Sequence, residues 1–109
     1  MKKLLAMLPF LVASTSLLAD GPGWTEFSKV TQLVVTSNGG INVRLEPNLN
    51  GCVSQSGYGE HYASIYSSHV GLDRIYSTLL ASYVNGKKVS LYLTDSACKV
   101  LEIRTERLN

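Results

Sequence analysis

The spacing of apolar residues constrains the fold of this chain more than any other feature. In five segments, apolar residues alternate with polar ones or gather in β-branched runs, and this pattern predicts strands. The predicted strands are 27–35, 41–45, 61–66, 87–95 and 99–106, of which the third has the weakest pattern. Apolar residues recur at helical spacing over 71–86, where Gly86 is suited to end a helix. The predicted order is therefore three strands, one helix and two strands.

This order predicts a small β-rich α+β fold: a five-stranded OB-fold-like barrel with one helix before the last two strands. A helix-on-sheet α+β sandwich fits the same order and stays open as the alternative topology. The turn SNGG, at 37–40, joins the first two strands as a hairpin. We expect the helix to make the main contribution to the core through an apolar face that comprises Leu72, Ile75, Leu79 and Leu80.

The N-terminal residues have the layout of a secretory signal peptide. A short cationic start, MKK, precedes an apolar core over 4–12, and the small residue Ala19 follows. This core is shorter than the ~20 apolar residues of a spanning helix, and Pro9 interrupts it, which argues against a stable membrane anchor. We expect cleavage after Ala19, with Ser14 or Ser16 as alternatives. The chain is then periplasmic or secreted.

Removal of residues 1–19 leaves residues 20–109, which is enough chain for a single domain. The whole sequence has 10 basic and 8 acidic residues, and the leader contains Lys2 and Lys3, so 10 − 2 = 8 basic residues balance the 8 acidic ones. The remaining basic residues are scattered among acids along the sequence. We therefore expect neither nucleic acid nor an anionic membrane as a partner.

The sequence contains two cysteines, Cys52 and Cys98, which lie 98 − 52 = 46 positions apart. An even cysteine count in a small exported domain predicts one disulfide. The bond would attach the last pair of strands to the first, and the chain-entropy model gives it about 4 kcal/mol of stabilisation. No histidine is suitably spaced to complete a zinc site with these cysteines, so we expect neither a metal nor another cofactor.

The sequence contains no recognisable catalytic motif: HExxH, GxSxG, a glycine-rich phosphate loop and a DxD cluster are all missing from it. His61 and His69 are the only histidines, and their positions on a strand and in a loop favour surface residues over a catalytic pair. Glu60 precedes His61, but adjacent strand residues point to opposite faces, which works against an acid–base pair. We therefore expect no enzyme activity.

Tyrosines supply most of the aromatic residues of this chain. Tyr76 and Tyr83 lie on the apolar face of the predicted helix, which indicates a role in the core or in an interface. Tyr58, Tyr62 and Tyr66 lie in a segment rich in serine and glycine, a composition typical of recognition surfaces. Aromatic rings beside hydroxyl groups also suit a sugar, so these three tyrosines are candidate ligand-binding residues.

Four stretches carry a family resemblance: GWTEFSKV at 23–30, INVRL after a glycine turn, NGC, and a helix that ends in LLASYVNGKKVSLYL. In this order they resemble the B subunits of subtilase cytotoxin and the related pertussis-like toxins. The chain also resembles a broader set of small exported bacterial proteins that share the strand after the helix and a late cysteine. The toxin likeness implies an OB-fold, a ring of five subunits, and binding of sialylated or other cell-surface glycans. It also implies that Ser28 contacts the sugar.

These observations leave three classes of function open. The first is an exported, non-catalytic binding module that binds a glycan, resembles a toxin B subunit and forms a homo-oligomer. The second is a small periplasmic or envelope protein, an inhibitor or a structural component, that binds another protein through its helix or an exposed strand edge. The third is an enzyme, for which the sequence offers no catalytic motif.

Overall fold

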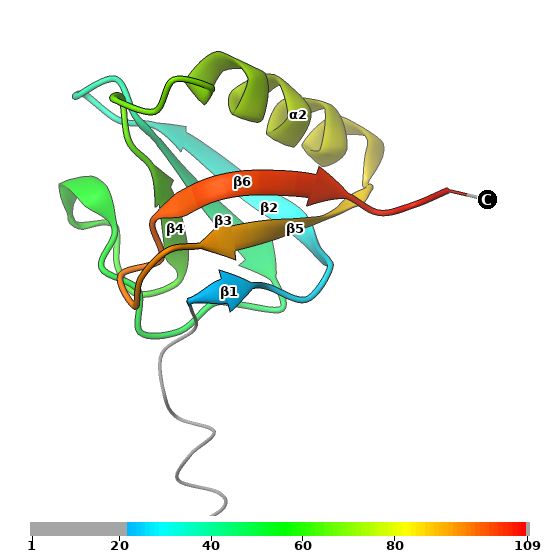
Figure 1. The fold of residues 1–109 in the computed structure, drawn as a ribbon, viewed down its shortest axis with the longest axis horizontal. Helices are drawn as coiled ribbons and strands as arrows, with labels where there is room; N and C mark the ends of the chain where they lie inside the picture. Colours follow the sequence, from blue (N-terminus) through cyan, green and yellow to red (C-terminus); the bar gives the residue numbers. More distant parts are fainter. Residues whose placement is uncertain (1–21, 109) are drawn as a thin grey trace, which may run out of the picture.

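The computed structural model describes residues 22–108 of the chain. The predicted signal peptide, residues 1–19, and its cleavage site lie outside the described residues. Within the described part, no helix is long and apolar enough to cross a membrane. This part forms one six-stranded sheet and one α-helix, which lies against the sheet (Figure 1).

The elements follow the predicted order, with one strand added at the start. They are β1 (Gly23–Trp24), β2 (Ser28–Val35), β3 (Ile41–Glu46), the short 3₁₀ helix η2 (Gln55–Gly57), β4 (Tyr62–Ile65), α2 (Leu72–Asn85), β5 (Lys88–Leu93) and β6 (Val100–Thr105). The helix ends at Gly86, whose φ of 69° is the left-handed conformation expected of it. The added strand, β1, pairs with Tyr92 and Leu93. Sequence reasoning missed β1 because two residues carry no periodic pattern.

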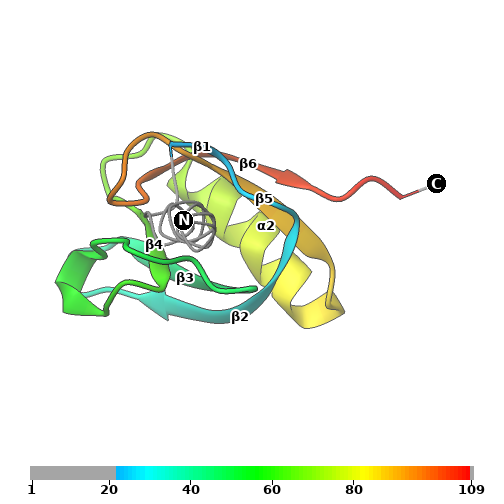
Figure 2. The same ribbon diagram turned by 90° about the horizontal axis from the view of Figure 1, so that it is seen from below.

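The strand order identifies the architecture. Neighbouring strands pair in the order β1-β5-β2-β3-β4, and β6 pairs with β5. A parallel bridge between Ser64 of β4 and Lys99, the residue before β6, brings the two ends of the sheet together. The sheet therefore curls into a partly closed barrel, with β2 and β3 on one wall and β5 and β6 on the opposite wall (Figure 2). This is an OB-fold-like barrel with the helix before the last two strands, which confirms the predicted fold class.

The barrel core combines the inward-facing strand residues with part of α2. Its fully buried strand residues include Val43, Leu45, Ile65, Val89, Leu91 and Leu93. From the helix, Leu79 is completely buried, Ile75 is nearly so, and Leu72 packs against the edge of the core. The prediction for Leu80 was wrong, because this side chain is 41% exposed. One position beyond Leu79 is a turn of about 100° around the helix axis, which takes Leu80 out of the buried face.

A β-bulge interrupts β2 and changes which of its residues face the core. The register with β3 shifts between Val30 and Gln32. Ser28 and Val30 are buried before this shift, whereas Leu33 packs against the core after it. The change from even to odd positions explains why the run of apolar residues in β2 did not show a clean alternation in the sequence.

Candidate functional site

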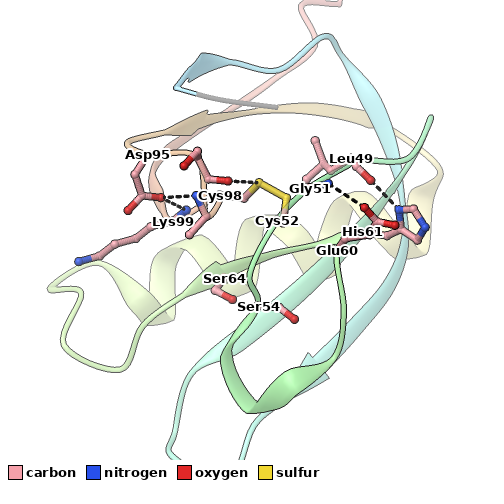
Figure 3. Close-up of a disulfide and its surroundings, with 12 residues drawn as sticks. Leu49, Gly51, Cys52, Ser54, Glu60, His61, Ser64, Asp95, Cys98 and Lys99 are labelled. Carbon is pink, nitrogen blue, oxygen red and sulfur yellow. Dashed lines mark hydrogen bonds between the residues drawn. A yellow bond between two sulfur atoms is a disulfide. The ribbon is translucent and has the colours of Figure 1, made fainter. Parts of the chain in front are cut away.

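The predicted disulfide between Cys52 and Cys98 is present and buried, which confirms that prediction. It connects the long loop between β3 and β4 to the turn between β5 and β6 (Figure 3). Two backbone hydrogen bonds reinforce this connection: Val53 N–H donates to the carbonyl of Ala97 at 3.2 Å, and Ser64 N–H donates to that of Cys98 at 3.0 Å. The disulfide thus fixes the loop and the turn against the same end of β4.

The loop held by the disulfide covers the outer face of β3 and β4. Asn42 and Ser64 lie opposite each other on these strands, and both are completely buried. The Asn42 amide donates to the carbonyl of Gln55 at 2.9 Å, Gln55 N–H donates to the Ser64 hydroxyl at 3.0 Å, and that hydroxyl donates to Asn42 at 2.7 Å. Each of these polar side chains therefore has a partner, and the loop is bound to the strands by a closed network.

The Gln55 side chain completes this network. Its amide donates to the carbonyls of Ile41 and Ile65, both at 3.0 Å, and its oxygen accepts from Asn38 at 3.1 Å. In OB-folds the outer face of the second and third barrel strands is a common ligand surface, together with two of the connecting loops. Here the part of the equivalent face around Asn42 and Ser64, on β3 and β4, is covered by the chain's own loop. This part of the face is therefore closed to a ligand.

A cavity of about 300 Å³ lies where β4 and β6 come together. We call it the seam pocket, and its lining consists of Tyr66, Ser68, His69, Val70, Thr94, Lys99, Val100 and Leu101. These residues come from the connection between β4 and α2, from the turn between β5 and β6, and from the start of β6. The turn between the last two strands is one of the loops with which OB-folds bind ligands. The seam pocket is the candidate functional site.

Tyr66 and Lys99 form the polar and aromatic centre of the seam pocket. The Lys99 ammonium lies 5.3 Å from the centroid of the Tyr66 ring, which is a cation–π distance. The turn fixes the backbone of Lys99, because the Lys99 backbone N–H donates to the Asp95 carboxylate at 3.2 Å and the Lys99 carbonyl accepts from Thr94 N–H at 2.9 Å. The pocket thus combines an aromatic ring, a cation and the hydroxyls of Ser68 and Thr94.

His69 forms one wall of the seam pocket and is fixed through both ring nitrogens. Its Nδ1 accepts a hydrogen bond from Gly71 N–H at 2.9 Å, which requires that this nitrogen carry no proton. Its Nε2 lies 2.7 Å from the Leu101 carbonyl and therefore donates to it. His69 therefore joins the loop before α2 to β6. Sequence reasoning missed this role because both partner groups belong to the backbone.

Tyr58 and Tyr62 form a pair at the opposite end of β4 from Tyr66. Their rings pack edge to face with centroids 5.8 Å apart. Tyr62 is only 8% exposed, and its hydroxyl donates to Gln32 at 2.7 Å, whereas Tyr58 is 47% exposed. Tyr66 is four positions after Tyr62, which corresponds to about 13 Å along an extended strand. The structure therefore brings two of the three predicted tyrosines together and leaves Tyr66 in the seam pocket.

Ser28 lies apart from the candidate tyrosines, at the start of β2 and opposite Val89 of β5. It is 2% exposed, and its hydroxyl donates to the carbonyl of Glu26 at 3.0 Å. Within residues 22–108, no recorded side-chain interaction joins it to Tyr58, Tyr62 or Tyr66. Because Ser28 is buried, a sugar cannot reach its hydroxyl in this structure.

Glu60 and His61 both serve the long loop. The Glu60 carboxylate accepts from Gly51 N–H at 3.1 Å, and His61 Nδ1 lies 2.7 Å from the carbonyl of Leu49 (Figure 3). Each side chain thus binds a different backbone group rather than its neighbour. In the part of the chain that the structure describes, histidine, cysteine, aspartate and glutamate form no group of three that could hold a metal ion.

Comparison with known proteins gives no family for this chain. No protein-family model matches it, and no curated protein matches it. The resemblance to toxin B subunits therefore stays a prediction, and the function is argued below from the residues and their geometry.

Proposed function

We propose that this chain is an exported, non-catalytic binding module that holds a glycan in the seam pocket. The observation that carries the proposal is the pairing of the Tyr66 ring with the Lys99 ammonium beside two hydroxyl-bearing residues. A sugar presents an apolar face that suits an aromatic ring and hydroxyl groups that accept and donate hydrogen bonds. The pocket offers a complementary group for each of these features.

The size and the construction of the pocket support a small, fixed ligand. About 300 Å³ is at the lower end of the range for small-molecule sites, which suits a terminal sugar better than a long chain segment. His69, the turn around Lys99 and the disulfide hold its walls in place. A preformed site lowers the entropy lost on binding, which matters for a weakly held ligand such as a sugar.

The hydrogen bonding of the acid and base residues supports a non-catalytic role. A general base needs a free nitrogen or oxygen within reach of the proton that it removes. His69 uses both ring nitrogens to bind backbone groups, and Glu60 and His61 each bind a backbone group of the long loop. The disulfide is consistent with an oxidising compartment, which supports export to the periplasm or beyond.

Assembly into a homo-oligomer is a second proposal, supported by the outer face of α2. This face carries Leu80, with Tyr83 three positions and Val84 four positions after it, so the three side chains lie on the same side of the helix. They are 41%, 48% and 71% exposed, respectively. A second copy of the chain packed on this face would bury these side chains, in line with the ring assembly that the toxin resemblance implies.

A glycan array tests the binding proposal. The wild-type protein should bind one class of glycan, and Tyr66→Ala and Lys99→Gln should each reduce the signal at least several-fold. Matched controls are Tyr58→Ala and Lys87→Gln, which remove the same groups away from the pocket and should bind normally. If folded wild-type protein binds no glycan, the protein-partner class of function takes its place. If Tyr66→Ala binds as well as the wild type, the seam pocket is not the site.

A further inference from the structure

His69, in the wall of the seam pocket, bridges two segments only while its ring is neutral. Its Nδ1 accepts a hydrogen bond from Gly71 N–H at 2.9 Å, and its Nε2 donates one to the Leu101 carbonyl at 2.7 Å. A ring that accepts through one nitrogen and donates through the other carries no charge, because the imidazolium ion donates through both. The closed wall is therefore built around the neutral form of His69.

This ring is the hydrogen-bonded link between the loop over 66–71 and β6. The backbone bonds of His69 stay local, since its N–H donates to the Tyr66 carbonyl and its own carbonyl accepts from Leu72 N–H. Among the described residues, no other hydrogen bond is recorded between this loop and β6. The ring also lies close against Gly71, where an added Cβ would meet Cε1 and Nδ1 of His69 at 3.4 and 3.5 Å. The hydrogen bonding that joins the loop to β6 therefore depends on a single side chain.

A proton added to Nδ1 removes one of the two ring bonds. The nitrogen then becomes a donor that faces the N–H of Gly71, so two donors meet and no hydrogen bond forms. The bond from Nε2 to Leu101 survives and is strengthened, because an ionised donor makes a stronger hydrogen bond. The protonated ring therefore remains with β6 and releases the loop before α2.

The charged groups around this ring give the imidazolium ion no partner. Lys99 lines the same pocket, and its ammonium carries the same charge. The other titratable or charged side chains of the loop, the first turn of α2, the turn between β5 and β6 and the start of β6 are Tyr66, Asp73, Arg74, Asp95 and Glu102. Among the described residues, none of these carboxylates has a recorded contact with His69, and Asp95 instead accepts from the backbone N–H groups of Ala97 and Lys99. Protonation would therefore set two positive charges in one pocket, which further disfavours the closed wall.

We propose that protonation of His69 opens the seam pocket, so that the site holds its sugar near neutral pH and releases it in mildly acidic surroundings. This inference rests on the proposed function and adds a control to the same site. Between about pH 5 and 8 histidine is the side chain that ordinarily changes charge, whereas carboxylates ordinarily stay ionised and lysines protonated. The closed wall contains the neutral ring, so it is favoured at higher pH and lost as the ring takes up a proton. By the same linkage, a bound sugar opposes protonation of His69.

His61 provides a matched control because its hydrogen bond has the opposite sense. Its Nδ1 lies 2.7 Å from the Leu49 carbonyl and therefore donates to it (Figure 3). No partner is recorded for its Nε2 among the described residues, so a second proton can be added there while the bond to Leu49 is kept. Protonation of His61 therefore leaves its loop attached, and the pH response of the pocket should follow His69 alone.

Nuclear magnetic resonance of the ¹⁵N-labelled protein without ligand tests the switch itself. The ring nitrogens of both histidines are followed from pH 8 to pH 5.5, together with the protection of each backbone amide against hydrogen exchange, corrected for the intrinsic effect of pH. As His69 takes up its proton, protection of the Gly71 amide should fall about tenfold. The Cys52 amide, which bonds to Glu60 in the loop held by His61, should keep its protection. A His69 ring that stays neutral at pH 5.5, or a protonated ring with Gly71 still protected, would overturn the proposal.

Affinity for the glycan identified on the array tests the regulation of the site. The wild type should bind about tenfold more weakly at pH 5.5 than at pH 7.5, and His61→Gln should show the same loss. His69→Gln keeps a side-chain donor for Leu101, and His69→Asn keeps an acceptor for Gly71, but neither amide takes up a proton. Each of these two variants should therefore bind equally well at the two pH values.

The two experiments separate failure of the regulation from failure of the glycan site. Equal wild-type affinities at pH 5.5 and pH 7.5 would overturn the regulation and leave the glycan site standing. If folded wild-type protein binds no glycan at either pH, the proposed function fails, and release of a sugar fails with it. The ligand-free experiment then decides alone whether protonation of His69 opens this wall.

Discussion

Two adjacent leucines of α2 give a direct test of how the helix packs. Leu79 is completely buried in the barrel core, whereas Leu80 is 41% exposed. Alanine at either position keeps a strong helix former, so a difference between the two variants reflects burial rather than helix propensity. Leu79→Ala removes three carbon groups from the core, worth about 2.4 kcal/mol at roughly 0.8 kcal/mol each. A residual cavity adds to this loss, which gives an expected total of about 3–4 kcal/mol.

Leu80→Ala is the matched control for this prediction. Because much of the Leu80 side chain is already in water, its truncation should cost about 1 kcal/mol or less. Urea denaturation followed by circular dichroism, with the disulfide intact, measures both losses. For a domain of this size the slope of the unfolding free energy with urea is about 1 kcal/mol/M, so Leu79→Ala should lower the midpoint by several molar units or prevent folding. Equal losses in both variants would contradict the packing of α2.

Three further predictions concern the disulfide, the covered face and the helix surface. Replacement of both Cys52 and Cys98 by serine should cost about 2–5 kcal/mol in urea unfolding, and an unchanged midpoint would contradict a stabilising role. Gln55→Leu leaves buried carbonyls without a donor, so it should cost about 1–3 kcal/mol and speed amide hydrogen exchange in residues 52–60. Exchange as slow as in the wild type would argue against the network. Tyr83→Glu should reduce the sedimentation coefficient to that of a monomer if α2 forms the oligomer contact, whereas a wild-type protein that is already monomeric would reject the oligomer proposal.

Much of the fold was predictable because its elements carry periodic patterns. The alternation of Val89, Leu91 and Leu93 against polar neighbours predicted β5, and those three residues are indeed completely buried. Gly86 ended the helix as expected. The disulfide followed from the even cysteine count together with the predicted export. Each of these features depends on local spacing or on a single chemical property, which one sequence contains.

The arrangement of the site was not predictable, because it depends on contacts between distant segments. Tyr62 and Tyr66 share a strand pattern, but Tyr62 bonds to Gln32 while Tyr66 meets Lys99 from the far end of the chain. The burial of Asn42 also has no sequence signal, since its partner Gln55 lies in a loop without periodicity. Such tertiary hydrogen bonds place polar residues where their type alone predicts exposure.

Chemical-shift mapping of a bound sugar tests the central proposal most directly. A glycan identified on the array would be titrated into the ¹⁵N-labelled protein, and the amide shifts followed residue by residue. Binding in the seam pocket predicts the largest changes at residues 66–70 and 94–101, with little change at Ser28. Changes centred on Ser28 and the start of β2 would contradict the seam pocket and favour the site that the toxin resemblance implies.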